Sequence, residues 1–124
     1  DIDNFKSIND QYGHQIGDKI IIGITKIIVD KCRKTDIIGR YGGEEFIIIM
    51  PGTDSDGAVY LGERIRSMIE KTVFSGGVHV TISAGIGEYK RETMEEFFKK
   101  VDEQLYKAKN KGRNRVECLE YITP

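Results

Sequence analysis

The sequence has few cysteines, little net charge and no long apolar run, and each of these absences argues against a class of protein. Among its 124 residues are two cysteines, two prolines and no tryptophan, and the formal net charge is −1. Cys32 and Cys118 lie far apart without a CxxC spacing, which argues against a disulfide framework or a zinc site and favours a reducing, cytoplasmic setting. The near-zero charge predicts no binding to nucleic acid or an anionic membrane. No apolar run approaches the ~20 residues of a membrane span. One compact globular domain remains.

Glycine is abundant instead, with fourteen residues, and it marks turns and places where backbone approaches a ligand. The apolar spacing predicts helices over residues 4–12, 18–32, 55–71 and 93–109. Strands are predicted over residues 35–41, 46–50, 78–86 and 115–120, and Asp1 reads as the end of another strand. This order predicts an α+β sandwich related to the ferredoxin-like plan, in which helices flank a central, mostly antiparallel sheet.

Three carboxylates form the first candidate site. Asp1 is expected at a strand end, and Glu44 and Glu45 at the tip of a hairpin around Gly42-Gly43-Glu44-Glu45. Carboxylates at one edge of a sheet can converge on a hard cation, which prefers oxygen ligands. Taken alone, the same run is equally consistent with a polar hairpin turn.

Basic and amide groups suggest a phosphate site. Asn4 is a plausible helix N-cap, and the helix start at Asn4-Phe5-Lys6 offers free backbone N–H groups to phosphate. Lys109 and Arg113, four residues apart, could clamp further oxygens. For that pair in isolation, a solvated basic helix end that complements the helix dipole explains the pattern better.

A third set of polar residues could read a base. Asn9 and Asp18 flank the run of residues 13–17, and an Asp carboxylate can accept from the N1–H and N2 amino donors of guanine, which adenine lacks. Helix capping by both residues is the alternative, especially for Asp18 at the expected start of the long helix, and both explanations can hold together. His14 is interpreted from the residues alone as structural or capping, because a lone histidine is weak support for a metal site.

A fourth set contains arginines, which suit phosphate and stack on bases. Arg33-Lys34-Thr35-Asp36 stands before the hairpin, and Arg64 lies on the next helix. A surface ion pair, which is common and contributes little energy, is the alternative.

Together these runs resemble the GGDEF family of diguanylate cyclase domains. Residues 42–46 give the GGEEF form of its signature. Residues 1–10 and 13–18 match its DxDxFKxxND and GHxxGD patterns, residues 81–85 its TxSxG strand, and residues 102–114 its DxxLYxAKxxGRN ending. The matches cover the whole chain in order and at the spacing of the family.

The resemblance implies a role for each matching residue. Magnesium, or alternatively manganese, would be bound by Asp1, the carbonyl of Ile2, Glu44 and Glu45. The GTP-binding residues would be Asn4, Phe5, Lys6, Asn9, His14, Asp18, Lys109 and Arg113, with Asn9 and Asp18 reading guanine. The groups acting in catalysis would be Glu44, Glu45, Lys109 and Arg113. An inhibitory site for the cyclic di-GMP product would comprise Arg33, Asp36 and Arg64.

The implied activity is the condensation of two GTP molecules into cyclic di-GMP with release of pyrophosphate, by two-metal phosphoryl transfer. Each domain would carry one GTP, so a two-fold homodimer is expected, together with an upstream sensor or receiver domain. The proton acceptor stays open between Glu45 and a water that it holds. The alternatives are a catalytically silent module that binds GTP or cyclic di-GMP, and a purely structural dimerisation domain.

Compared with the family pattern, residues 1–124 are expected to lack an N-terminal DxLTGLxNR-like helix and the first half of the central strand. Unpaired strand edges and a free α-ammonium beside the carboxylates would follow. We therefore expect this stretch alone to be poorly active and prone to associate through the exposed edge.

Overall fold

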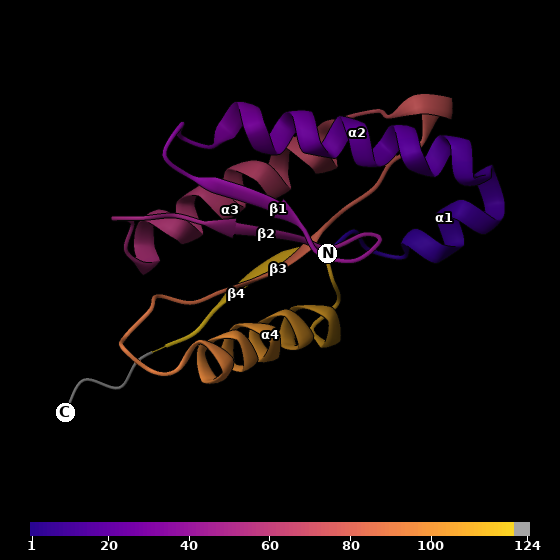
Figure 1. Cartoon of the computed structure of the whole chain (residues 1–124). Coiled ribbons are helices and arrows are strands. Elements are labelled where there is room, and N and C mark those ends of the chain that lie inside the picture. The colour runs from indigo at the N-terminus through magenta and orange to yellow at the C-terminus, as the bar shows by residue number, and fades with distance from the viewer. Residues whose placement is uncertain (121–124) are drawn as a thin grey trace.

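The computed structural model describes residues 1–120 of the chain. Its helices are α1 (Phe5–Tyr12), α2 (His14–Lys31), α3 (Ser55–Lys71) and α4 (Met94–Asn110), with a short 3-10 turn at Ser75–Gly77. Its strands are β1 (Ile37–Arg40), β2 (Phe46–Ile49), β3 (Ser83–Ile86) and β4 (Arg115–Cys118). Figure 1 shows α2 and α3 on one side of the strands and α4 on the other. Within the described range, none of the helices combines the length and apolar character needed to cross a membrane.

The strands form two ladders that the first three residues connect. β1 pairs antiparallel with β2, with Ile37 opposite Ile49, and β3 pairs parallel with β4. Ile2 N–H donates to Glu44 O at 3.1 Å on one side, while Asp3 N–H donates to Thr81 O at 2.9 Å on the other. The α+β class is confirmed. The β3–β4 pair is parallel because α4 forms the crossover between the two strands.

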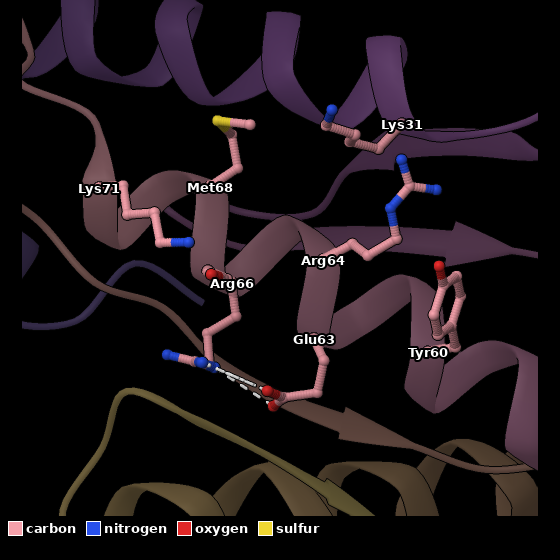
Figure 2. Close-up of a pocket in the computed structure, with 8 residues that line it drawn as sticks. Lys31, Tyr60, Glu63, Arg64, Arg66, Met68 and Lys71 are labelled. Carbon is pink, nitrogen blue, oxygen red and sulfur yellow. Dashed lines mark hydrogen bonds and ion pairs between the residues drawn. The ribbon is translucent and has the colours of Figure 1, made fainter.

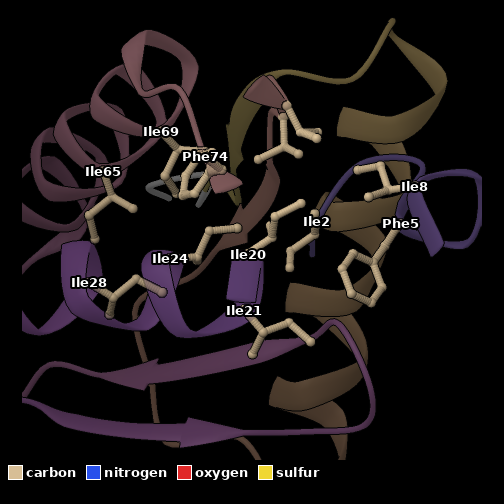
Figure 3. Close-up of a cluster of buried hydrophobic side chains, with 12 residues drawn as sticks. Ile2, Phe5, Ile8, Ile20, Ile21, Ile24, Ile28, Ile65, Ile69 and Phe74 are labelled. Carbon is tan, nitrogen blue, oxygen red and sulfur yellow. The ribbon is translucent and has the colours of Figure 1, made fainter. Parts of the chain in front are cut away.

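Isoleucine supplies most of the core. Ile20, Ile24 and Ile28 recur every four residues along α2, and each is at most 3% exposed. Ile69 of α3 and Phe74 pack into the same cluster (Figure 3). Burial of each such side chain contributes roughly 1.5–3 kcal/mol, so this stripe fixes α2 and, through it, the start of α2 where the candidate site lies.

Two element boundaries differ from the sequence-based prediction by more than two residues. α2 begins at His14 rather than Asp18, because Gly13 turns the chain in one residue at φ 89°. Asp18 therefore lies inside the helix, and the alternative that it caps the helix start is wrong. β3 begins at Ser83 rather than Val78, although Val78 and Val80 are buried.

Two helix starts differ in how they are capped. The Thr93 hydroxyl accepts from Glu96 N–H at 3.1 Å at the start of α4. Asn4 does occupy the N-cap position of α1, but its side chain makes no capping hydrogen bond, because its backbone is left-handed at φ 55°. The first turn of α1 consequently keeps N–H groups that the cap does not satisfy.

Candidate active site

A cleft of about 530 Å³ opens between α1, the start of α2 and the β1–β2 hairpin. Its lining includes most of the predicted substrate residues, from three separate parts of the chain. The lining residues are Phe5, Lys6, Asn9, Asp10, His14, Asp18, Ile21, Arg40, Gly43 and Glu44. The cleft thus brings Asn9 and Asp18 together with Phe5, Lys6 and Glu44. Three residues that the resemblance also assigns to the nucleotide, Asn4, Lys109 and Arg113, do not line it.

The closest packing at the cleft joins α1 to α2. A Cβ atom at Gly17 would lie 1.9 Å from Asn9 Oδ1 and 3.2 Å from Phe5 Cζ, so only glycine fits there. Asn9 Oδ1 is buried and accepts no hydrogen bond from the described residues. Buried acceptors in folded proteins nearly always have a partner, so this oxygen is suited to a ligand donor. Asp18 and His14 are exposed along the same wall.

The start of α1 has the features of an anion site. Asn4 and Lys6 are exposed, and the Asn4 side chain leaves the first-turn N–H groups free. Helix N-termini favour phosphate through these groups and the helix dipole. Phe5, at 7% exposed, anchors the turn in the core.

Acidic groups surround the segment of residues 1–3. The Asp1 carboxylate, 7% exposed, forms an ion pair with Lys109 of α4 at 2.5 Å. The hairpin tip lies beside this segment, because Ile2 N–H donates to Glu44 O at 3.1 Å. Within residues 1–120, however, no three His, Cys, Asp or Glu side chains converge closely enough to hold a metal ion.

The hairpin tip is ordered by a residue that the sequence reasoning missed. Arg40, the last residue of β1, donates from Nε and Nη2 to Gly43 O at 3.1 and 2.8 Å, and Tyr41 N–H donates to Glu45 O at 2.7 Å. Glu44 and Glu45 are half-buried. Hairpin tips are usually exposed, but here Ile2 N–H donates to Glu44 O at 3.1 Å and holds the first segment against the tip. A cation two residues before the glycine pair was the available signal for Arg40.

Asp3 was also missed. Its carboxylate, on a residue only 7% exposed, accepts from Thr81 Oγ1 at 2.7 Å, Ser83 Oγ at 2.6 Å and Asn114 N–H at 3.0 Å. It therefore ties the first segment to β3 and to the turn after α4. That turn carries Arg113, which is exposed. The alternation of hydroxyl residues at Thr81 and Ser83 in a mostly apolar predicted strand was the signal for a polar partner.

The predicted product-binding residues form two separate groups. Arg33 and Asp36 close a turn: Arg33 N–H donates to Asp36 Oδ2 at 2.8 Å, and the Arg33 guanidinium contacts Asp36 Oδ1 at 3.5 Å. Arg33 Nη2 also donates to Pro51 O at 3.0 Å and to the Thr53 hydroxyl at 2.5 Å. The Asp36 side chain is 1% exposed. The Arg33–Asp36 ion pair therefore has a structural role in closing this turn.

Arg64 lies apart from that turn, in a groove of about 430 Å³ along α3. Its guanidinium stands 5.7 Å from the Tyr60 ring centroid. Figure 2 shows Arg64 directed toward α2 and Lys31, whereas Glu63 and Arg66 lie on the other side of α3. Neither Arg33 nor Asp36 lines this groove, so the structure does not bring the three residues into one pocket.

The family model for "Diguanylate cyclase, GGDEF domain" matches residues 1–115. The chain belongs to the GGDEF family. Diguanylate cyclase DgcM of Escherichia coli is 44% identical over 117 residues, covering 94% of this chain and 28% of that protein. Diguanylate cyclase A of Treponema denticola is 42% identical over 121 residues, covering 94% of this chain and 33% of that protein. The chain thus spans about a third or less of the curated relatives that it matches.

Solved GGDEF domains have the same fold. The active GGEEF domain of a diguanylate cyclase from Vibrio cholerae is 35% identical with a TM-score of 0.91, and the match covers 98% of this chain and 80% of that one. The GGDEF domain of DgcB from Caulobacter crescentus in complex with c-di-GMP is 34% identical with a TM-score of 0.90, over 95% of this chain and 73% of that one. The fold and family predicted from the sequence are confirmed.

Proposed function

We propose that this domain is a diguanylate cyclase that joins two GTP molecules into cyclic di-GMP. The observation that carries the proposal is the cleft itself, in which Asn9 and Asp18, Lys6 and Glu44 line one space. Asp18 accepts from the guanine N1–H and N2 amino group, while the buried Asn9 Oδ1 takes a second donor. Adenine would leave these acceptors unpaired, which gives the domain its preference for GTP.

The triphosphate runs from the cleft toward the start of α1. The N–H groups around Asn4, Phe5 and Lys6 face it, together with the side chains of Lys6, Lys109 and Arg113. Lys109 currently pairs with Asp1 at 2.5 Å. Because Asp1 is also a proposed metal ligand, Lys109 is expected to exchange from Asp1 to phosphate when nucleotide and cation bind.

Magnesium fits the donor set by its chemistry, because carboxylate and carbonyl oxygens are the ligands that hard cations prefer. Asp1, the Ile2 carbonyl, Glu44 and Glu45 would hold it. Ile2 N–H donates to Glu44 O, and the N–H and C=O of one residue in an extended segment point the same way. The Ile2 carbonyl is therefore expected to face the glutamates. Bound there, magnesium, or manganese in its place, would neutralise phosphate charge.

In the reaction, the 3′-hydroxyl of one GTP attacks the α-phosphorus of the other, and pyrophosphate leaves. The half-buried Glu45 carboxylate takes the hydroxyl proton, and Lys109 and Arg113 stabilise charge on the phosphate oxygens. One cleft holds one GTP, so two copies of the domain must face each other around a two-fold axis. The greater length of the curated relatives is consistent with a sensor or receiver domain that controls this encounter in the whole protein.

Product inhibition is a further part of the proposal. The Arg33 side chain is 57% exposed and Arg64 is also exposed, so both guanidinium groups could contact cyclic di-GMP held at the surface. Asp36 is 1% exposed and would act by orienting Arg33. Binding there would hold two domains misaligned without entering the cleft.

The test is to incubate the full-length protein with GTP and Mg²⁺ and to identify products by mass spectrometry. A cyclic dinucleotide and pyrophosphate in a 1:2 ratio support the proposal. Tight GTP binding without product would instead identify a silent nucleotide-binding module. Failure to bind GTP at all would leave only a structural role and contradict the assignment of the cleft.

A further inference from the structure

The turn after α4 contains an unusual run of backbone conformations. Gly112, Arg113 and Asn114 all have positive φ angles, of 115°, 62° and 48°. Glycine adopts this region freely and asparagine tolerates it, but arginine rarely does. Strained residues of this kind persist only where the surrounding structure holds them, and they cluster at functional sites. Arg113 is thus the residue whose conformation requires an explanation.

We propose that Asn114, held from α3 by Arg66, is a positioning residue that keeps the Arg113 guanidinium in place for the triphosphate. The inference rests on the proposed function, because it takes Arg113 to be a phosphate ligand. Asn114 and Arg66 themselves touch no substrate in this proposal. They act through Arg113.

Backbone contacts anchor the turn on the side of the sheet. Asn114 N–H donates to the buried Asp3 carboxylate at 3.0 Å, and Arg113 N–H donates to Ala108 O at 3.0 Å. The first bond links residues 111 positions apart in the sequence, and it reaches a carboxylate two residues from Asp1. The turn is therefore fixed to the segment that carries a proposed metal ligand.

Side-chain contacts anchor the same residue on the side of α3. Arg66 Nη1 donates to Asn114 Oδ1 at 2.8 Å, and Asn114 Nδ2 donates to Glu70. Arg66 is itself held by Glu63 at 3.2 Å and by Glu70 at 3.6 Å, and its side chain is 17% exposed. Figure 2 shows Arg66 turned toward Glu63 and away from Arg64. Both ends of the Asn114 amide are thus used, and the residue cannot rotate without breaking a charged contact.

Arg113 is the free member of this arrangement. Its side chain is exposed, and in the described part of the chain no hydrogen bond or ion pair holds its guanidinium. Lys109, four residues earlier, already reaches Asp1. The turn is held from two sides, and it leaves the Arg113 guanidinium unpaired beside this lysine. Such an arrangement is suited to preorganise a contact with an anion.

The first experiment compares Arg66→Gln with the full-length unmodified protein. Arg66→Gln removes the donor to Asn114 and keeps much of the side-chain stem. We expect the KM for GTP to rise by ~10-fold, the scale of a misplaced charge-assisted contact, with a smaller change in kcat and unchanged binding of guanosine, which has no phosphate. Lys71→Gln is the matched control, since it removes a positive charge from the same helix and the same groove without touching Asn114.

The decisive experiment repeats Arg66→Gln in an Arg113→Met background. If Arg66 acts through Arg113, its substitution should have no further effect on the KM for GTP there. A merely structural role would give the same increase in both backgrounds, and additive effects would overturn the inference while leaving Arg113 a phosphate ligand. If Arg113→Met alone leaves KM unchanged, the proposed role of Arg113 fails first, and the inference fails with it.

A second variant guards against a folding artefact. Asn114→Gly keeps a residue that adopts positive φ without strain but removes both side-chain contacts. It should reproduce the KM increase of Arg66→Gln with a similar thermal midpoint. A KM equal to that of the unmodified protein would show that the backbone bond to Asp3 is sufficient and would contradict the role assigned to the side chain.

Discussion

The candidate GTP cleft and the Arg33–Asp36 turn are both rich in polar residues, yet their hydrogen bonding differs. In the cleft, Asn9 Oδ1 is buried without a partner among residues 1–120, and Asp18 and Lys6 are exposed along its walls. In the turn, Arg33 makes contacts to Asp36, the Pro51 carbonyl and Thr53. The cleft has polar groups that lack hydrogen-bond partners, whereas most polar groups of the turn are already paired.

This difference in hydrogen bonding predicts which residues contribute to ligand binding and which contribute to stability. Groups that lack a partner gain one when a ligand arrives, so their substitution should change binding more than stability. Groups that are already paired must give up contacts before they bind, so a ligand gains less from them. The cleft should therefore dominate activity, and the turn should modulate it.

The largest effect should come from Glu44, which lines the cleft, and its neighbour Glu45. Glu44→Gln or Glu45→Gln should lower kcat by ~10²-fold or more, the scale of losing a group that stabilises the transition state. Because both side chains are half-buried, the thermal midpoint is measured alongside turnover. Glu103→Gln, an exposed glutamate of α4, is the control. Near-normal cyclic di-GMP synthesis by either variant would remove that glutamate from the mechanism.

The next effect concerns base choice. Asp18→Ser should narrow the preference for GTP over ATP by roughly 10-fold or more, since unpaired groups in the site are what reject the wrong base. Competition binding with the two nucleotides measures this, with Asp30→Ser at the far end of α2 as the control. Equal binding of ATP and GTP by the unmodified protein would show that the cleft does not read guanine.

The residues of the cleft could be predicted from the sequence, but the residues that hold the neighbouring turn in place could not. Asn9, Asp18 and Glu44 stand in short motifs whose spacing is visible along the chain, and the structure brings them to one cleft. The bonds from Asp3 to Asn114 and from Arg66 to Asn114 join positions 111 and 48 residues apart. No local period connects such residues, so only the folded chain shows that they act together.

The helix boundary at His14 was missed for a related reason. Apolar spacing begins clearly at Ile20, and Gly13-His14-Gln15 carries no apolar residue, so periodicity placed the start of the helix too late. In the structure α2 already begins at His14, because Gly13 alone makes the turn between α1 and α2. The close contact of Gly17 with Asn9 follows from this short connection and could not be read from the sequence.

That contact gives a smaller effect within the cleft. Gly17→Ala places a Cβ atom 1.9 Å from Asn9 Oδ1, so Asn9 must move or the two helices must separate. We expect the KM for GTP to rise several-fold and stability to fall by about 1–3 kcal/mol, as for other overpacked sites. Gly23→Ala is the matched control on the same helix, because its Cβ would meet the Phe74 ring at 3.0 Å, away from the cleft.

The two glycine variants separate packing from binding. Gly23→Ala should alter the thermal midpoint and leave the KM for GTP unchanged, whereas Gly17→Ala should alter both. Equal KM values in the two variants, at whatever stability, would show that Asn9 does not need its present position to bind guanine.

The smallest effect should come from the paired turn. Arg33→Ala should weaken the binding of cyclic di-GMP by only ~5-fold, because the guanidinium must share its donors with Pro51 and Thr53 while it binds. Stability should fall by at most ~1 kcal/mol, since the Arg33–Asp36 pair is partly solvated. Isothermal titration with cyclic di-GMP measures the affinity, and Lys34→Ala removes a neighbouring exposed cation as the control. Unchanged affinity in Arg33→Ala would mean that the turn is only a structural ion pair. A loss as large as that in the cleft variants would instead show that paired groups can be released at little cost, and the contrast between the two regions would no longer hold.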